Sequence, residues 1–115
     1  MSAEMKYIQI PHVLAVLSYD GDYHYIDRLA YSNSKALALY YLREAVRSFN
    51  ALKRSPPKDI PSEVKELMNN IDSRYLEIEV ENMHRIEKTQ ELREILSLIC
   101  TKALATASKF IKQGE

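Results

Sequence analysis

Three arginines recur with helical spacing in the middle of the chain, at Arg43, Arg47 and Arg54. Intervals of four and seven residues place their side chains on one side of an α-helix. A solvated helix face usually mixes charge signs, whereas the like-charged pair Arg43 and Arg47 costs about 0.2–0.5 kcal/mol when no anion relieves it. The spacing therefore favours neutralisation of phosphate groups, with an ordinary solvated helix face as the structural alternative.

Charge is segregated along the chain, although the net charge is zero. Residues 28–58 hold seven bases against Glu44 alone, and residues 59–94 hold five bases against ten acids. A basic segment attracts phosphate, while an acidic segment elsewhere keeps the protein soluble and off other polyanions. If two lysines near the C-terminus lie alongside the arginines, a continuous cationic track results. The candidate nucleic-acid-binding residues are Arg28, Lys35, Arg43, Arg47, Arg54, Lys102 and Lys109.

One cluster of titratable residues offers a different chemistry. Asp20, Asp22, His24 and Asp27 are dense enough to hold a divalent ion and activate a water for hydrolysis. The cluster lacks the further oxygens and closing glutamate of a calcium loop. Turn formation by Asp20 and helix capping by Asp22 explain the same residues without a metal.

Other catalytic classes find little support. Two glycines leave no room for a phosphate loop or a dinucleotide fingerprint, and one cysteine with three scattered histidines gives no zinc spacing. Cys100 lies in an apolar run, where a reduced and inert thiol is usual. We therefore expect no enzyme activity, no metal and no cofactor.

Eight tyrosines are the unusual feature of the composition, and six of them fall between Tyr19 and Tyr41, next to the basic segment. Tyrosine combines an aromatic face for stacking with a hydroxyl that needs water or a partner, so it suits interfaces and single-stranded nucleic acid. The structural alternative is that Tyr19, Tyr25 and Tyr41 fill the rim of a helical bundle with their hydroxyls in solvent.

A chain of 115 residues with few glycines and prolines predicts one mainly α domain over residues 1–115, a small bundle of four or five helices. The single cysteine, the lack of an 18-residue apolar stretch and the lack of a secretory signal lead us to expect a cytoplasmic protein without membrane contact. Apolar periodicity and capping residues place the helices at about 10–19, 23–30, 34–54, 62–71 and 92–110. Ser32, Asn33 and Ser34 are three candidate caps for the helix at 34–54, and Ser62 is the candidate cap for the helix at 62–71.

Residues 76–81 are ambiguous, because the alternation LEIEVE fits a half-buried strand while Leu76, Val80 and Met83 also fit a helix. We favour the strand, paired with residues 5–10 or with 85–88 as a hairpin, so a minor two-stranded element is expected around 75–88. The run 95–100 is apolar almost all round, which predicts a C-terminal helix in the middle of the bundle.

Three pieces of sequence, residues 25–30 (YIDRLA), 34–36 (SKA) and 42–47 (LREAVR), resemble the helical domain of the small subunit of archaeal type I-A CRISPR surveillance (Cascade) complexes. The likeness covers about residues 13–54. It implies a small helical protein without catalytic residues that lines an RNA-guided complex. On this chain, the implied contacts with R-loop DNA carry over to Arg28, Lys35, Arg43 and Arg47. Some members carry a larger β-rich insertion, for which only residues 75–88 leave room.

From these observations we expect a non-catalytic small subunit of an RNA-guided antiviral complex. Its basic helical face would contact the nucleic acid backbone without sequence preference, because phosphates carry no sequence information. Its other partners would be neighbouring protein subunits or further copies of itself. The alternative is a protein-protein adaptor whose tyrosine-rich surface buries against a partner, without nucleic acid.

Overall fold

The computed structural model describes residues 7–19 and 24–111, and every regular element within them is a helix. The prediction of a mainly α protein is confirmed, with six helices in the described part. In chain order they are α2 (Gln9–Tyr19), α3 (His24–Ala30), α4 (Lys35–Arg54), α5 (Ser62–Asn70), α6 (Ser73–His84) and α7 (Thr89–Ile111).

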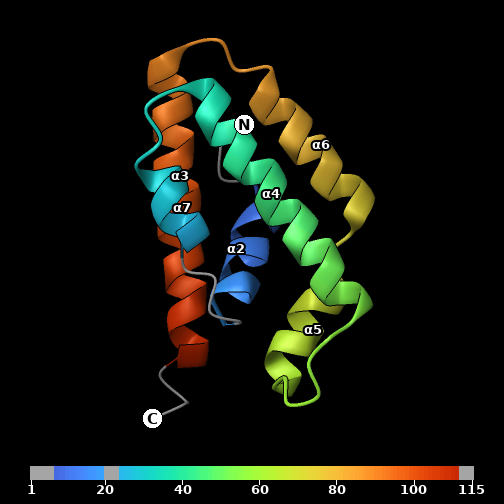
Figure 1. Cartoon of the computed structure of the whole chain (residues 1–115). Helices are drawn as coiled ribbons and strands as arrows, with labels where there is room; N and C mark the ends of the chain where they lie inside the picture. The colour runs from blue at the N-terminus through green and yellow to red at the C-terminus, as the bar shows by residue number, and fades with distance from the viewer. Residues whose placement is uncertain (1–6, 20–23, 112–115) are drawn as a thin grey trace.

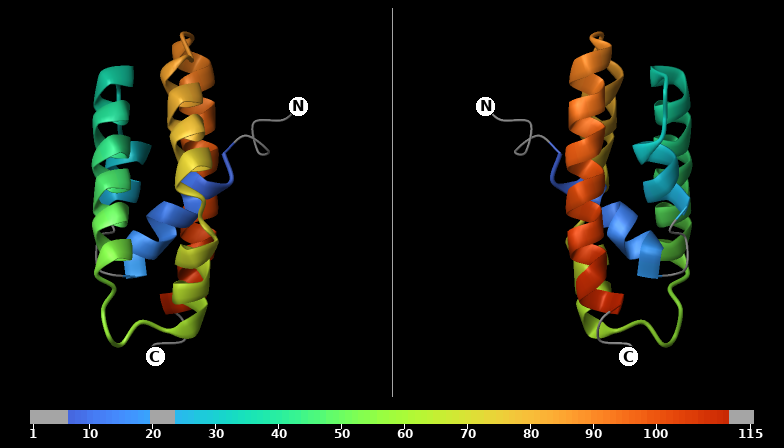
Figure 2. Two further views of the ribbon diagram at one scale, coloured as in Figure 1. Left: turned by 90° about the vertical axis from the view of Figure 1, so that its right-hand side faces the viewer. Right: turned by 90° about the vertical axis from the view of Figure 1, so that its left-hand side faces the viewer.

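Helix α2 lies at the centre of the molecule (Figure 1). It contacts each of the other five helices, and the two side views show it crossing obliquely between α4 on one side and α6 and α7 on the other (Figure 2). Eight of its eleven residues are buried, including the run from Val13 to Ser18. The buried Ser18 hydroxyl donates to the Leu14 carbonyl at 3.0 Å, which satisfies it without a partner helix.

The prediction that the C-terminal helix is central is therefore wrong. Helix α7 packs along α2, and Ser97 on it is exposed while Leu98 is only half-buried. The shorter apolar run VLAVL in α2 is the one surrounded on all sides, because α2 is polar only near its ends.

Local signals account for most helix boundaries. Of the three candidate caps, Ser34 is the one that caps α4, and its hydroxyl accepts from the Leu37 N–H at 3.2 Å. Ser62, the predicted cap of the next helix, is instead its first helical residue, since Pro61 occupies the cap position without a side-chain hydrogen bond. The last helix begins at Thr89, where the apolar phase of the sequence slips.

The predicted strand at 76–81 and both of its predicted pairings are wrong. Residues 73–84 form α6, which begins at Asp72, whose carboxylate accepts from the N–H groups of Arg74 at 2.9 Å and Tyr75 at 3.3 Å. The proposed hairpin start at Arg85 instead closes the last turn of α6 through hydrogen bonds to the Glu81 and Asn82 carbonyls. The Asp72 carboxylate, four residues before Leu76, caps the first turn and so favours a helix over a strand.

In α6 a charged residue is buried and the apolar residue next to it is exposed, which is the opposite of what a half-buried strand would show. Glu79 is 0% exposed, whereas its neighbour Ile78 is 50% exposed. The two Glu79 carboxylate oxygens accept hydrogen bonds from the N–H groups of Gln9 at 3.1 Å and Ile10 at 3.0 Å. Glu79 therefore caps the start of α2 from another helix, where the positive end of the helix dipole favours a carboxylate.

A second contact ties the same two helices together. The Gln9 side-chain amide donates to the Asp72 carbonyl at 2.9 Å and accepts from the Asp72 N–H at 2.7 Å. Gln9 thus satisfies both backbone groups of Asp72, the residue whose side chain caps α6. The first residue of the central helix and the first turn of α6 are held in one hydrogen-bonded unit.

We predict that Glu79→Ala lowers the free energy of unfolding by about 3 kcal/mol, because it removes the acceptor of the buried Ile10 N–H and of the partly buried Gln9 N–H. Urea denaturation followed by circular dichroism measures the change. Glu77→Ala, two residues away and exposed on the same helix, is the control and should cost little. Equal losses in the two variants would contradict the capping role.

Burial raises the pKa of Glu79, and the backbone N–H groups of Gln9, Ile10 and Ile8 only partly oppose this shift. From about the ordinary value of 4.5 up to the raised pKa, the folded protein then holds more protons than the unfolded chain. Stability from this group therefore falls as pH rises through that window. We predict that the difference in unfolding free energy between the wild type and Glu79→Gln, which cannot titrate, shrinks from pH 4.5 to 7. A difference that grows with pH would contradict the raised pKa.

Candidate nucleic-acid interface

Helix α4 has one buried side and one exposed side. Its buried residues are apolar and pack into the core: Ala38, Leu39, Leu42, Ala45 and Phe49. On the opposite side, Arg43, Arg47 and Arg54 are exposed, as their spacing predicts. We call these three residues the arginine face; at 1.5 Å per residue they span about 16 Å along the helix.

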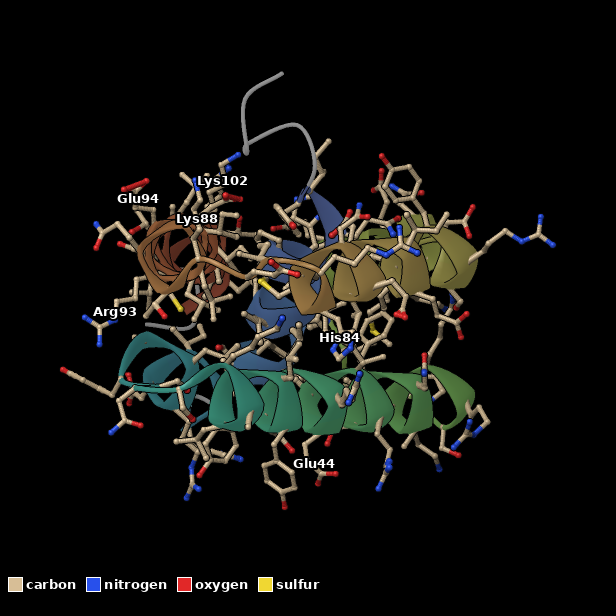
Figure 3. The ribbon with its side chains drawn as sticks, turned by 90° about the horizontal axis from the view of Figure 1, so that it is seen from above. Glu44, His84, Lys88, Arg93, Glu94 and Lys102 are labelled. Atoms are coloured by element: carbon tan, nitrogen blue, oxygen red, sulfur yellow. The ribbon has the colours of Figure 1, made fainter. Side chains whose placement is uncertain are left out.

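One carboxylate lies within the arginine face. Glu44 is on the outer side of α4 (Figure 3), and its carboxylate lies 3.3 Å from the Arg47 guanidinium, with side-chain exposures of 34% and 80%. An exposed pair of this kind contributes only about 0–1 kcal/mol, so Arg47 can exchange Glu44 for a phosphate at little cost. The like-charge repulsion between Arg43 and Arg47 is also reduced by this neighbour.

Arg28 of α3 packs against the aromatic ring of Tyr41 on α4. Its guanidinium lies 5.2 Å from the centre of the Tyr41 ring and donates to the Tyr41 hydroxyl at 3.0 Å. This combination of a cation-π contact and a hydrogen bond fixes an otherwise flexible side chain. Arg28 is thus held beside α4, with further N–H groups still available.

The tyrosines divide between the two roles expected for them. Tyr25 and Tyr41 are half-buried against the core, and the Tyr25 hydroxyl lies 2.9 Å from the Ser48 hydroxyl. These two residues fill the rim of the bundle, but their hydroxyls contact Ser48 and Arg28, whereas solvent was the predicted partner. In contrast, Tyr40 is 59% exposed and Tyr31 is 84% exposed, so their rings are available for stacking. Tyr19 lies between these extremes at 36%.

A hollow of about 310 Å³ opens between α3 and α4. Two aromatic pairs border it: His24 with Tyr25, whose ring centres are 4.3 Å apart, and Tyr40 with Tyr41, 5.3 Å apart and edge to face. Charged groups complete the lining, which consists of His24, Tyr25, Arg28, Tyr40, Tyr41 and Glu44. We call it the tyrosine hollow.

The structure does not bring the two predicted lysines of α7 to the arginine face. Lys102 lies on the side of α7 that faces away from α4 (Figure 3). It borders a separate hollow of about 220 Å³ with Ile8, Pro11 and His12. Burial first, and then the charges of Lys102 and Lys109, lower the pKa of His12, so both lysines lie near α2. A continuous track over α4 and α7 is therefore not formed.

Lys35 also stands apart from the arginine face. It is the half-buried first residue of α4 and lines a third hollow with Thr89 and Arg93, where the starts of α4 and α7 meet. Lys53 of the basic segment has a structural role, because its ammonium group donates to the Ile71 carbonyl at 3.2 Å, between α5 and α6.

The alternative metal cluster is only partly described. His24 and Asp27 lie on α3, while Asp20 and Asp22 fall outside the described residues. Within residues 7–19 and 24–111, no three His, Cys, Asp or Glu side chains are arranged to hold a metal ion. Cys100 is buried, its thiol donates to the Ile26 carbonyl at 3.6 Å, and burial raises its pKa to about 11, so it is a poor nucleophile.

Two residues of this interface, Tyr40 from the group of six tyrosines and Glu44, were not among the predicted binding residues. Tyr40 precedes Arg43 by three positions and Arg47 by seven, which places it on the same side of α4. Glu44 is the single acid of residues 28–58, and this unusual position in a basic segment could have marked it as a candidate site residue. The sequence could not show that Tyr40, Glu44 and Arg28 line one hollow, because this arrangement depends on how α3 packs against α4.

Over residues 7–19 and 24–111, the fold and this surface define a small helical protein with an exposed cationic face on α4. The chain is 39% identical over 110 residues to a protein of Archaeoglobus fulgidus described as "Uncharacterized protein", a match that covers 95% of this chain and 94% of that one. This chain belongs to the same family as that archaeal protein. No family model and no solved structure matches the chain.

Crossing a bilayer requires a helix that is both long and apolar. In residues 7–19 and 24–111, no helix combines these two properties.

We predict that His12 titrates below its ordinary pKa of 6.5, and that Lys102→Met with Lys109→Met moves the midpoint upward, because two nearby positive charges are removed. NMR of the imidazole resonances against pH measures it. Arg43→Gln is the control and should leave the midpoint unchanged. A midpoint that responds equally to Arg43→Gln would contradict the separation of the lysines from the arginine face.

Proposed function

We propose that this protein binds the phosphate backbone of nucleic acid through the arginine face, as a non-catalytic subunit of a larger assembly. The observation that carries the proposal is the exposure of Arg43, Arg47 and Arg54 along one side of α4, with Arg28 held against Tyr41 of the same helix. Arginines that neutralise phosphates release bound counterions, which supplies most of the affinity of sequence-independent binding.

The aromatic side chains next to the arginine face favour single strands over duplexes. Tyr40 projects from the same side of α4 with more than half of its surface exposed. An unpaired base stacks on such a ring whatever its identity, whereas the bases of a duplex are already stacked on each other. The proposed ligand is therefore a single-stranded segment that runs along α4.

The specific setting that we propose is an RNA-guided complex, on the strength of the resemblance of residues 13–54 to the small subunit of archaeal type I-A CRISPR complexes. In such a complex the guide RNA supplies sequence specificity by base pairing, so a subunit that reads only the backbone is useful. Few charges per subunit suffice, because several copies on one strand bind with a high effective concentration.

The test is binding of fluorescently labelled oligo(dT), followed by anisotropy over a series of salt concentrations. We predict that the triple variant Arg43→Gln, Arg47→Gln, Arg54→Gln loses affinity at low salt. The slope of log affinity against log salt should also fall by about two, because each phosphate that an arginine neutralises on a single strand adds roughly 0.7 to the slope. Stability should change little, since the three side chains are exposed.

A charge-matched control removes three exposed cations from another surface, with Lys65→Gln, Arg74→Gln and Arg85→Gln on or next to α5 and α6. This variant has the same net charge as the triple arginine variant, so it separates a local site from general attraction. Equal losses of affinity in both triple variants, or no binding of oligo(dT) by the wild type, would overturn the proposal.

One observation favours the adaptor function as a second candidate. Tyr75 is 47% exposed and Ile78 is 50% exposed on α6, and the acids Glu77 and Glu81 are exposed on the same helix. An apolar pair with an acidic border suits a protein partner better than a polyanion. This function predicts an affinity for a protein partner that hardly changes with salt concentration. The variant Ile78→Asp should abolish that binding.

A further inference from the structure

We infer that the tyrosine hollow binds one unpaired guanine base of a strand held on the arginine face. The inference rests on the proposed function and deepens it, because it assigns a base-binding site beside a surface that otherwise touches only phosphates. It stands on the size of the hollow, on the aromatic rings that border it and on the two opposite charges in its lining.

The size and the lining suit a single planar ligand. A volume of about 310 Å³ lies at the small end of the range of ligand pockets, which starts at about 300 Å³. Rings border the hollow from both helices, with Tyr25 from α3 and Tyr40 from α4. A nucleobase stacks on aromatic side chains when it is splayed out of its strand.

Continuity with the arginine face indicates how a strand would present the base. Tyr40 lines the hollow and lies three residues before Arg43, so one helix side carries both the edge of the hollow and the first arginine. A backbone that follows the arginines passes this edge. The base can then turn inward while its phosphates remain on α4.

Glu44 selects the kind of base. Its carboxylate lies 3.3 Å from the Arg47 guanidinium, and a phosphate that binds Arg47 leaves this carboxylate in the lining of the hollow, where it favours a donor-rich partner. Guanine presents two adjacent donors, N1–H and the N2 amino group, that match the two oxygens of a carboxylate. Thymine and uracil flank their single N–H with carbonyl oxygens, and cytosine and adenine place a ring acceptor beside their amino group.

Arg28 supplies the complementary contact. Its guanidinium has five N–H donors, of which the structure uses one for the Tyr41 hydroxyl. The carbonyl oxygen of guanine lies next to N1–H, so a base that meets Glu44 with its two donors turns this acceptor toward a neighbouring cation. Glu44 and Arg28 lie on different helices and both line the hollow, as such an arrangement requires.

The experiment compares three labelled strands of equal length: oligo(dT), oligo(dT) with one central guanine, and the same strand with inosine, which lacks the N2 amino group. We expect the wild type to bind the guanine strand about tenfold more tightly than oligo(dT), and inosine to lose most of that gain. Glu44→Gln should reduce the ratio of guanine to thymine affinity toward one. Glu66→Gln, an exposed acid of α5, is the control and should keep the ratio.

Stacking is tested separately at Tyr40. Tyr40→Ala should lose about tenfold in affinity for the guanine strand, while Tyr40→Phe, which keeps the ring, restores it. Equal binding of the three strands by the wild type overturns the inference and leaves the proposed function intact. Failure to bind any of the strands overturns both, and an unchanged ratio in Glu44→Gln overturns the selection of guanine by the carboxylate.

Discussion

The arrangement of this protein depends on one buried carboxylate at the start of its central helix. Glu79 is excluded from solvent and accepts from two N–H groups at the beginning of α2. A helix start leaves several backbone donors without partners, and at the start of α2 the Ile10 N–H is buried, where water cannot supply an acceptor, while the Gln9 N–H is partly buried. Because α2 contacts all the other described helices, the point at which α6 anchors it determines where the rest can pack.

The same architecture leaves the outer side of α4 exposed. The core is completed by α2 and by the apolar side of α4, with Phe49 and Leu42 almost inaccessible. Arg43, Arg47 and Arg54 lie outside this core and are exposed. Their charges thus have little role in folding, and the fold does not explain why three arginines recur there. The short helix α3 adds Arg28, which among the described cations of this region is the one that packs on an aromatic ring.

The sequence was informative where a feature depends on one helix. The long helix that starts after Ser34, its apolar side and its row of arginines all follow from spacing and a local cap, and the structure has them as predicted. The helix at 73–84 was missed although Asp72 offered a local cap, because the burial of Glu79 in place of Ile78 depends on donors of α2 that lie 69 and 70 residues away. No local pattern reveals a partner at that distance.

The candidate site shows the same limit. Arg43, Arg47 and Arg54 lie on one face because a single helix carries them, whereas the predicted alignment of Lys102 and Lys109 with them required the relative rotation of α4 and α7. Helical periodicity contains no information on that rotation. For the same reason Tyr40 and Glu44 became notable only when α3 was placed beside α4 and enclosed a space between them.

The contact between Arg28 and Tyr41 has a consequence for how affinity is distributed over the surface. A free arginine loses much of its side-chain entropy when it grips a ligand, but Arg28 has already lost part of it by lying against the ring. The end of α4 near α3 is therefore preorganised, and the end near Arg54 is not. In the complex that we propose, a strand would be anchored firmly at one end of the helix and held loosely at the other, and that complex would have a direction.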